Sequence, residues 1–332
     1  MRSIFLGSTK HIPTVYDKDL IAYLRGDAQI CETIFSKSDV LENPAQFAET
    51  EFIFSTWGMP QFEEEEIRRL LPALKCVFYG AGTVQEFARP FLACGVRVFS
   101  AWAANAVPVA EMAVAQIVLA NKGFFLTSRV FREQGYRPAR NTYKRCRGNY
   151  GEAVGIIGAG MVGKKVIEML RAYRLEVLVF DPFLSDESAT ALGVRKCDLP
   201  TLFEKAFVVS NHLANNPQTV GMLHYGLFER MRENAVFINT GRGAQVVEDD
   251  LVRVLRERPD LTALLDVTEP EPPVAGHPFY TLENCLLTPH IAGSSGDEVA
   301  RMGLYMRQEC EAVLSLAPTR YEVTAEMLKT MA

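Results

Sequence analysis

The sequence predicts an α/β protein made of two doubly wound parallel-sheet domains. Its length of 332 residues corresponds to about two domains of ordinary size. Short runs of β-branched or aromatic residues alternate with segments of helical periodicity along the chain. This alternation favours parallel strands, because two parallel neighbours must be joined by a crossover, usually a helix. A long apolar segment separates two groups of strands, so each group is expected to form its own sheet.

The first third of the chain carries the first group of strands. These predicted strands are Ser3–Leu6, Ile30–Ile34, Phe52–Phe54, Cys76–Tyr79 and Arg97–Phe99. Helices are expected between them, one of them over Phe62–Leu71. In that helix the glutamate run at 63–66 is expected to form a solvated face, with arginines four residues after two of its members.

The long apolar segment is predicted to be a single helix over Asn105–Phe131. Pro108 is tolerated near its start, and Glu111 lies in its first turn. Its most apolar run, Val107–Ala120, is about 14 residues long and includes Glu111 and Gln116, whereas a membrane span needs about 20 apolar residues. We therefore expect no membrane span and a helix that carries the chain from one domain to the other.

The second group of strands follows this helix. Its predicted members are Ala153–Ile157, Glu176–Phe180, Phe207–Ser210, Ala235–Asn239, Thr262–Asp266 and Cys285–Thr288. A last segment, from about 301 to 328, again has apolar residues at helical spacing.

Composition and charge exclude several classes of protein. A hydrophobic content of 48% excludes a disordered chain. The net charge of −5 argues against a nucleic-acid partner held by electrostatics. The seven cysteines are scattered without a CxxC pair, which indicates free thiols in a reducing compartment rather than a disulfide framework or a metal site. The apolar run at the N-terminus is too short for a signal peptide, so a cytoplasmic protein is expected.

The strongest local signal is a G-x-G-x-x-G motif between an apolar strand and a helix. Gly158 allows a tight turn, Gly160 allows close approach of a pyrophosphate, and Gly163 allows the helix to pack on the strand. Asp181 ends the next strand, 18 residues after Gly163, where a carboxylate accepts hydrogen bonds from the adenosine ribose and repels a 2′-phosphate. NAD is therefore the expected cofactor, in preference to NADP. The predicted contacts here are Gly158, Gly160, Met161, Val162, Gly163 and Asp181.

Polar and titratable residues follow the other strands of the second group. In an open parallel sheet the ligand lies beyond the carboxyl ends of the strands, so these residues are expected to gather beside the dinucleotide. Arginine, glutamate and histidine together at such an edge indicate a reactive site. The residues are His212, Thr240, Arg242, Asp266, Glu269, Glu271, His290 and Gly293.

Four segments resemble the signature blocks of the D-isomer-specific 2-hydroxyacid dehydrogenases: VGIIGAGMVG, FINTGRGAQVVE, LLDVTEPEP and LLTPHIAG. NAVPVAEMAVA at 105–115 and ARMG at 300–303 add to a resemblance that covers about 77–303. It implies a Rossmann NAD-binding domain over 103–303, with a dimerisation helix near 105–131. It also implies a flavodoxin-like substrate-binding (catalytic) domain formed by 1–102 with 304–332, and a homodimer.

The resemblance also implies roles for individual residues. The catalytic trio falls on Arg242, Glu271 and His290, with Glu269 as the competing glutamate. The family's glutamate lies five residues after its aspartate, which selects Glu271. The implied cofactor contacts are His212, Thr240, Arg242, Asp266 (to the nicotinamide carboxamide), His290 and Gly293. Besides Arg242, the implied substrate-binding residues are Gly80, Ala81 and Gly82, in a loop that departs from the family pattern at Thr83, Val84 and Gln85.

The expected activity is hydride transfer that interconverts a D-2-hydroxy acid and the 2-oxo acid. Arg242 is expected to bind the carboxylate and polarise the carbonyl, His290 to exchange the proton, and Glu271 to orient His290. An alternative is an NAD(H)-sensing interaction protein of the same fold, similar to co-repressors. A formate-dehydrogenase-like enzyme is disfavoured by Glu271. The sequence does not name the acid, or assign roles to Trp57, Trp102 and the basic stretch 137–147.

Overall fold

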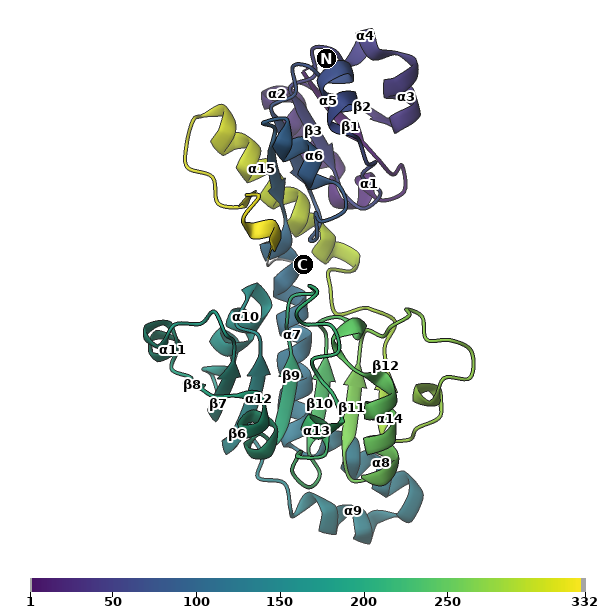
Figure 1. Cartoon of the computed structure of the whole chain (residues 1–332), viewed down its shortest axis with the longest axis vertical. Coiled ribbons are helices and arrows are strands. Elements are labelled where there is room, and N and C mark those ends of the chain that lie inside the picture. Colours follow the sequence, from purple (N-terminus) through teal and green to yellow (C-terminus); the bar gives the residue numbers. More distant parts are fainter. Residues whose placement is uncertain (1, 330–332) are drawn as a thin grey trace. The chain divides into compact units, whose positions relative to one another are not determined.

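The chain folds around two β-sheets, one in each of two units. A computed structural model describes residues 2–329, apart from the side chain of Asp27. Unit 1 consists of residues 1–105 with 294–332, and unit 2 of residues 106–293 (Figure 1). The polypeptide therefore leaves unit 1, builds unit 2 and returns.

Unit 1 has a sheet of order β13-β5-β4-β3-β1-β2. β1 to β5 are parallel, and their order corresponds to the doubly wound 2-1-3-4-5 arrangement of flavodoxin-like folds, as predicted. β13 joins β5 in antiparallel orientation and was not predicted, since a strand of two residues carries no periodic signal. The strands are β1 (Ser3–Leu6), β2 (Ile30–Phe35), β3 (Phe52–Ser55), β4 (Cys76–Tyr79), β5 (Arg97–Ser100) and β13 (Glu322–Val323).

Helices cover both faces of the unit-1 sheet. Buried residues of α1, α2 and α15 pack on one face, and those of α4, α5 and α6 pack on the other. The predicted C-terminal helix ends at Leu314 rather than near 328, because Leu316 has a left-handed backbone (φ 56°) and Pro318 follows. The helices are α1 (Ile12–Val15), α2 (Lys18–Asp27), α3 (Lys37–Glu42), α4 (Pro44–Phe47), α5 (Glu64–Leu70), α6 (Ala88–Ala93) and α15 (Ala300–Leu314).

Unit 2 has an all-parallel sheet of order β12-β11-β10-β9-β6-β7-β8. The chain order reverses between β6 and β9, which makes this the switch point where such sheets bind dinucleotides. The predicted strands are present, and the two-residue β8 is additional. The strands are β6 (Tyr150–Ile157), β7 (Arg174–Phe180), β8 (Arg195–Lys196), β9 (Val208–Asn211), β10 (Val236–Asn239), β11 (Thr262–Leu265) and β12 (Cys285–Leu287).

Two layers of helices enclose this sheet. α7, which lies behind the sheet in Figure 1, packs on one face with α10 and α11, while α12, α13 and α14 pack on the other. The helices are α7 (Trp102–Asn121), α8 (Phe124–Gln134), α9 (Tyr136–Tyr143), α10 (Met161–Leu170), α11 (Asp186–Leu192), α12 (Leu199–Lys205), α13 (Tyr225–Phe228) and α14 (Glu248–Glu257).

The predicted single helix over Asn105–Phe131 is wrong, because the chain breaks at Gly123 into α7 and α8. Gly123 has a left-handed backbone (φ 68°), and a Cβ there would lie 2.3 Å from the sulfur of Cys146. α7 is 20 residues long with a mean hydropathy of 1.5, which is enough by length and composition for a membrane span and longer than the predicted apolar run of about 14 residues. Half of this apolar stretch of α7 is buried in the structure. Ala110, Ala113 and Ile117 belong to the unit-2 core, as in the core helix of a soluble protein.

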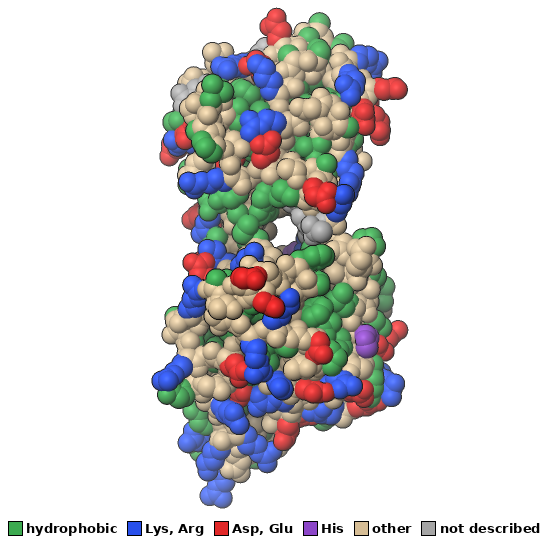
Figure 2. Space-filling model, turned by 60° about the vertical axis from the view of Figure 1, so that its left-hand side comes forward, with side chains coloured by type: hydrophobic (Ala, Val, Ile, Leu, Met, Phe, Trp, Pro, Cys, Tyr) green, Lys and Arg blue, Asp and Glu red, His purple; other side chains and the backbone are tan. Residues whose placement is uncertain are grey.

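The basic stretch 137–147 lies on the surface. Lys and Arg side chains gather over the lowest part of the molecule in Figure 2, where Figure 1 places α9. Its basic residues, all exposed, are Arg137, Arg140, Lys144, Arg145 and Arg147.

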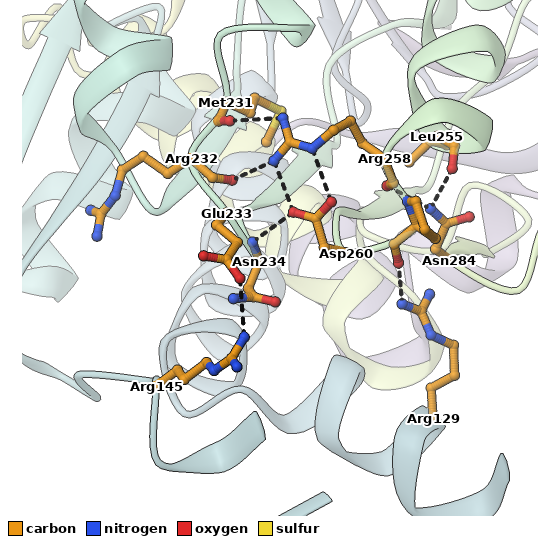
Figure 3. Close-up of polar contacts among 11 residues, drawn as sticks. Arg129, Arg145, Met231, Arg232, Glu233, Asn234, Leu255, Arg258, Asp260 and Asn284 are labelled. Atoms are coloured by element: carbon orange, nitrogen blue, oxygen red, sulfur yellow. Dashed lines mark hydrogen bonds and ion pairs between the residues drawn. The ribbon is translucent and has the colours of Figure 1, made fainter. Parts of the chain in front are cut away.

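Ion pairs and hydrogen bonds lie at the amino end of the unit-2 strands, ahead of β10, β11 and β12 (Figure 3). Arg258 donates to both carboxylate oxygens of Asp260 (2.9 and 2.8 Å), and Asp260 also accepts the N–H of Asn234. Arg145 pairs with Glu233 at 3.1 Å, and Arg129 donates to the carbonyl of Pro259. These contacts join the α8–α9 region to the edge of the sheet opposite the predicted site.

Candidate functional site

The glycine-rich loop joins β6 to α10 at the switch point of the unit-2 sheet. Gly158 has φ 90°, and a Cβ there would lie 2.8 Å from the carbonyl oxygen of His212. A Cβ on Gly163 would lie 2.0 Å from the carbonyl oxygen of Gly158, so helix and loop touch there. Gly160 differs, because a Cβ would meet no atom within 4 Å.

That open space lies at the N-terminus of α10, whose N-cap residue Gly160 supplies no side-chain acceptor. The N–H groups of the first turn, including those of Met161 and Val162, have no acceptor within the helix. Free donors, the positive end of the helix dipole and open space are the features that bind a pyrophosphate. The loop therefore fits the phosphates of NAD.

Asp181 comes directly after β7 and holds the glycine loop from the side. Its carboxylate accepts the N–H of Ala159 at 2.7 Å and that of Phe183 at 2.8 Å. Asp181 remains partly exposed. Its negative charge thus lies beside the loop, where ribose hydroxyls are expected.

His212 follows β9 and is buried, with 8% of its surface exposed. Its Nε2 lies 2.9 Å from the hydroxyl of Ser210, and its Nδ1 lies 3.4 Å from the hydroxyl of Thr240. Burial lowers the pKa of His212 to about 4, so the ring is neutral at neutral pH. His212 thus lies at the dinucleotide edge as an uncharged group.

Arg242 lies in the loop after β10, between two glycines that the structure requires. A Cβ on Gly243 would lie 2.0 Å from the backbone carbon of Thr268, and one on Gly241 would lie 2.6 Å from Oε1 of Gln245. The Arg242 guanidinium donates to the carbonyl of Gly241 at 2.7 Å and forms no ion pair among residues 2–329. Burial lowers its pKa, although arginine stays cationic at any physiological pH. It is a largely buried cation that forms no ion pair in the described part of the chain, and the charge of Glu271 acts on it only from beyond ion-pair distance.

Asp266 follows β11 and organises the loop that carries His290. Its Oδ1 accepts the hydroxyl of Thr288 (2.6 Å) and the N–H of Ile291 (2.9 Å), and its Oδ2 accepts the N–H of Ala292 (2.9 Å). His290 donates its own N–H to the carbonyl of Asp266 at 3.0 Å and has φ 54°. Three of about four lone-pair sites on the Asp266 carboxylate are thereby used inside the protein.

The structure brings Glu271, not Glu269, to His290. Oε1 of Glu271 lies 2.7 Å from Nδ1 of His290, with both side chains between 40 and 45% exposed (41 and 44%). Glu269 instead donates its backbone N–H to Oε1 of Glu248. A carboxylate on Nδ1 fixes the tautomer in which Nε2 is the free nitrogen.

In unit 1 the loop Gly80–Gly82 follows β4. Its carbonyls are bound by hydroxyl groups: Thr56 donates to Gly80 at 2.7 Å, and Ser100 donates to both Ala81 and Gly82. The N–H groups of Ala81 and Gly82 donate to no group in the described part of the chain. Free backbone donors of this kind bind anions.

Three residues of unit 1 that the sequence left without a role, Gln85, Trp102 and Trp57, have defined contacts in the structure. Gln85 donates to the carbonyl of Leu328 at 2.9 Å. Trp102 packs edge-on against Tyr321, with ring centroids 6.0 Å apart. Trp57 is 37% exposed and lies edge-on to His11, also at 6.0 Å.

Sequence reasoning missed several polar residues that hold these loops. Asn211 and Gln245 are buried beside Arg242, and Glu248 lies 3.6 Å from Nε2 of His277. Burial raises the pKa of Glu248, which together with Glu269 and His277 lines a pocket of about 400 Å³. Glu248 is the last residue of the FINTGRGAQVVE segment, but its role could not be predicted, because its contacts are with Glu269 and His277, which lie in a later segment of the chain.

The fold and this edge define an α/β dinucleotide-binding protein with a cation and a histidine–carboxylate pair beside the cofactor loop. Residues 114–292 match the family model described as "D-isomer specific 2-hydroxyacid dehydrogenase, NAD binding domain". The chain belongs to this family, and the predicted resemblance is confirmed.

Individual proteins with similar sequences are also named as dehydrogenases. The chain is similar to D-3-phosphoglycerate dehydrogenase of Archaeoglobus fulgidus, with 30% identity over 229 residues, 69% of this chain and 43% of that protein. It is 31% identical over 205 residues to the putative 2-hydroxyacid dehydrogenase YoaD of Bacillus subtilis, covering 60% of this chain and 59% of that one. The chain thus spans about half the length of these relatives.

Solved structures share the fold along the chain. A phosphoglycerate oxidoreductase from Rhizobium etli superposes with a TM-score of 0.79 at 20% identity, covering 98% of this chain and 99% of that one. The NAD-complexed D-isomer specific 2-hydroxyacid dehydrogenase from Lactobacillus delbrueckii ssp. bulgaricus gives 0.77 at 18% identity, covering 98% and 100%.

Proposed function

We propose that the chain is an NAD-dependent oxidoreductase that interconverts a D-2-hydroxy acid and the corresponding 2-oxo acid. The observation that carries this proposal is the 2.7 Å pair of His290 and Glu271 at the sheet edge that also holds the glycine loop. Arg242, a cation that forms no ion pair among the described residues, lies in a loop at the same edge. The family and the names of the relatives support the same reaction class.

Arg242, His290 and Glu271 have different roles in the proposed reaction. The Arg242 guanidinium offers a rigid fork of donors, which binds the substrate carboxylate and stabilises negative charge on the carbonyl oxygen. Nε2 of His290 gives its proton to that oxygen during reduction and takes it back during oxidation. Glu271 orients the ring through Nδ1 and favours the imidazolium. When bound, NADH would supply the hydride to the α-carbon during reduction, and NAD⁺ would accept it during oxidation.

Other residues bind without reacting. We assign the cofactor pyrophosphate to the Gly158–Gly163 loop and the adenosine ribose to Asp181. Thr240, His212, Asp266 and Gly293 contribute to the same cofactor edge. In unit 1, the free N–H groups of Ala81 and Gly82 are the proposed donors to a substrate carboxylate, with Gly80 in the same loop.

The test is NADH oxidation with a panel of 2-oxo acids, run beside NADPH. We expect turnover of at least one 2-oxo acid, and a higher kcat/KM with NADH because Asp181 repels a 2′-phosphate. Arg242→Ala is expected to raise KM and lower kcat. His290→Ala is expected to lower kcat by about 10²–10⁴-fold while NADH still binds. No turnover of any 2-oxo acid by the wild type would overturn the proposal.

The pH profile separates the two glutamates. Glu271→Gln removes the charge that stabilises the imidazolium, so the limb of the reduction profile that needs protonated His290 should move to lower pH. Glu269→Gln is the matched control and should leave the limb in place. An unmoved or upward-shifted limb in Glu271→Gln contradicts the role of Glu271.

We further propose a homodimer in a reducing, cytoplasmic compartment. Exposed aromatic residues on α8 and α9 support an association surface, and the seven cysteines, scattered without a CxxC pair, support the compartment. Light scattering is the measurement for the dimer. The alternative of a co-repressor-like interaction protein has no supporting observation among the described residues or in the proteins to which the chain is similar.

A further inference from the structure

Three side-chain amides lie buried together beneath the Arg242 loop. Asn211 ends β9, Asn239 ends β10 and Gln245 follows in the next turn, with exposures of 0, 1 and 0%. The amide nitrogen of Asn211 donates to Oδ1 of Asn239 at 2.9 Å and to Oε1 of Gln245 at 2.6 Å. Asn211 is therefore the centre of the cluster.

The outer two amides hold the backbone of Arg242 from both sides. Its N–H donates to Oε1 of Gln245 at 3.1 Å, and its carbonyl accepts from Nδ2 of Asn239 at 3.2 Å. Oδ1 of Asn239 also accepts the N–H of Gly241 at 3.0 Å. The Arg242 side chain has a single protein acceptor in the described structure, so its direction depends on this backbone.

The same cluster reaches the loop after β9. Oδ1 of Asn211 accepts the N–H of Leu213 at 3.2 Å, and Nε2 of Gln245 donates to the carbonyl of Leu213 at 2.9 Å. Leu213 follows His212, whose carbonyl lies against Gly158 of the cofactor loop. The amides thus join the loop that carries Arg242 to the loop beside the cofactor.

The chemistry of the cluster suits a cation that must stay available. A buried amide is costly unless its donors and acceptors are bonded, and here each of the three makes at least two hydrogen bonds. Amides supply those bonds without a negative charge. A carboxylate in their place would pair with the guanidinium and compete with an anionic substrate.

We propose that Asn211, acting through Asn239 and Gln245, is a positioning residue that fixes the Arg242 backbone so that the guanidinium meets the carboxylate and carbonyl of the 2-oxo acid. This inference rests on the proposed function. It assigns a role to three residues that do not touch substrate. It also explains why position 241 is glycine, since a Cβ there would lie 2.9 Å from Nδ2 of Asn211.

The test compares Asn211→Leu with Asn284→Leu in the full chain. Asn284 is a matched control: it is 5% exposed, and its Nδ2 donates to the carbonyls of Leu255 (2.9 Å) and Arg258 (3.4 Å) at the opposite edge of the sheet (Figure 3). Both substitutions remove a buried amide. With the best 2-oxo acid of the wild type, kcat/KM should fall about 10–100-fold in Asn211→Leu, mainly through KM. The Kd for NADH should rise less than the KM for the 2-oxo acid, because Asn211 also accepts the N–H of Leu213 beside the cofactor loop, and Asn284→Leu should keep near wild-type kinetics.

A second readout does not depend on activity. Amide hydrogen exchange of the peptide 239–246 should be faster in Asn211→Leu, because the acceptors of Gly241 and Arg242 lose their anchor, and unchanged in Asn284→Leu. If Asn211→Leu does not fold, Gln245→Met, which removes the acceptor of the Arg242 N–H at similar volume, takes its place.

The outcomes separate the two proposals. Wild-type exchange and kinetics in the Asn211 variant, or equal kinetic damage in Asn284→Leu, would overturn the positioning role. Absence of turnover in the wild type would overturn the proposed function, while the exchange result still decides whether the amides hold the loop.

Discussion

The amino and carboxyl edges of the unit-2 sheet differ in whether their arginines form ion pairs. At the amino edge three arginines pair with a carboxylate: Arg258 with Asp260 and Arg145 with Glu233 (Figure 3), and Arg232 with the buried Glu152 at 2.6 Å, whereas Arg129 donates to the carbonyl of Pro259. At the carboxyl edge, Arg242 forms no ion pair in the described structure, the charge of Glu271 acts on it only from a distance, and its loop is held by neutral amides.

The difference separates scaffold from site. A paired charge contributes to the structure and has little left for a ligand, whereas a desolvated, unpaired cation is stabilised by the ligand that neutralises it. Asp266, the one buried carboxylate of the carboxyl edge described here, binds two backbone N–H groups and a hydroxyl rather than an arginine. The positive charge of Arg242 at this edge is therefore available to an anionic ligand.

Removing Asp266 should give the largest effect. Asp266→Ala leaves the buried N–H of Ala292 without its acceptor, at about 1–3 kcal/mol, and the part-buried N–H of Ile291 without its acceptor at a smaller cost. Because the same loop carries His290, kcat for 2-oxo acid reduction should fall as well. Urea unfolding and steady-state kinetics measure the two losses.

Asp260→Ala is the counterpart from the amino edge. It removes an ion pair whose carboxylate is 26% exposed, so water replaces part of what is lost. We expect a smaller loss of stability and unchanged kcat. Equal loss of kcat in both variants would break the distinction between the edges.

An effect of intermediate size should come from His212. Its folded-state pKa of about 4 lies below the ordinary 6.5, so the unfolded chain binds the proton first as the pH falls. Stability should be unaffected at pH 7 and decline below pH 6.5, by about 2 kcal/mol at pH 5 and about 3 kcal/mol near pH 4. The difference between wild type and His212→Gln in unfolding free energy isolates this contribution. A difference that does not change with pH would show that the ring titrates normally.

The smallest effect is expected for Arg145→Ala. The Arg145–Glu233 pair is about two-thirds exposed on both sides (68 and 69%), and exposed pairs contribute about 0–1 kcal/mol. Kinetics should equal those of the wild type. A loss of NADH turnover would show that the amino edge takes part in function.

The sequence predicted what periodicity and local motifs encode. Buried parallel strands read as apolar runs, so Val236–Asn239 and its neighbours were placed to within a residue or two. The glycine loop was recognisable because its requirements are local: Gly163 touches Gly158, five positions earlier. Family spacing selected Glu271, and the structure places that glutamate on His290.

Features that depend on distant partners escaped prediction. The chain breaks after α7 at Gly123, which has a left-handed backbone, and glycine is required there because Cys146 occupies the space beside it, a contact that no periodicity reveals. Asn211 and Gln245 are 34 positions apart, and each alone looks like a polar residue at the end of a strand. Their role appears only when β9 and β10 lie side by side.

The division of unit 1 into two stretches of chain has a consequence for its synthesis. β5 pairs with β13, so Phe99 can form this pairing only after Glu322, more than 200 residues later in the chain, has been synthesised. At about 5–20 residues per second, a ribosome needs on the order of 10–45 s to deliver that partner. Unit 2 is complete in the nascent chain before then, and the buried carboxylate of Glu309 binds Arg320 and Tyr321 only at the end. Unit 1 therefore contains the first strands to be synthesised and also the last strand that its sheet needs.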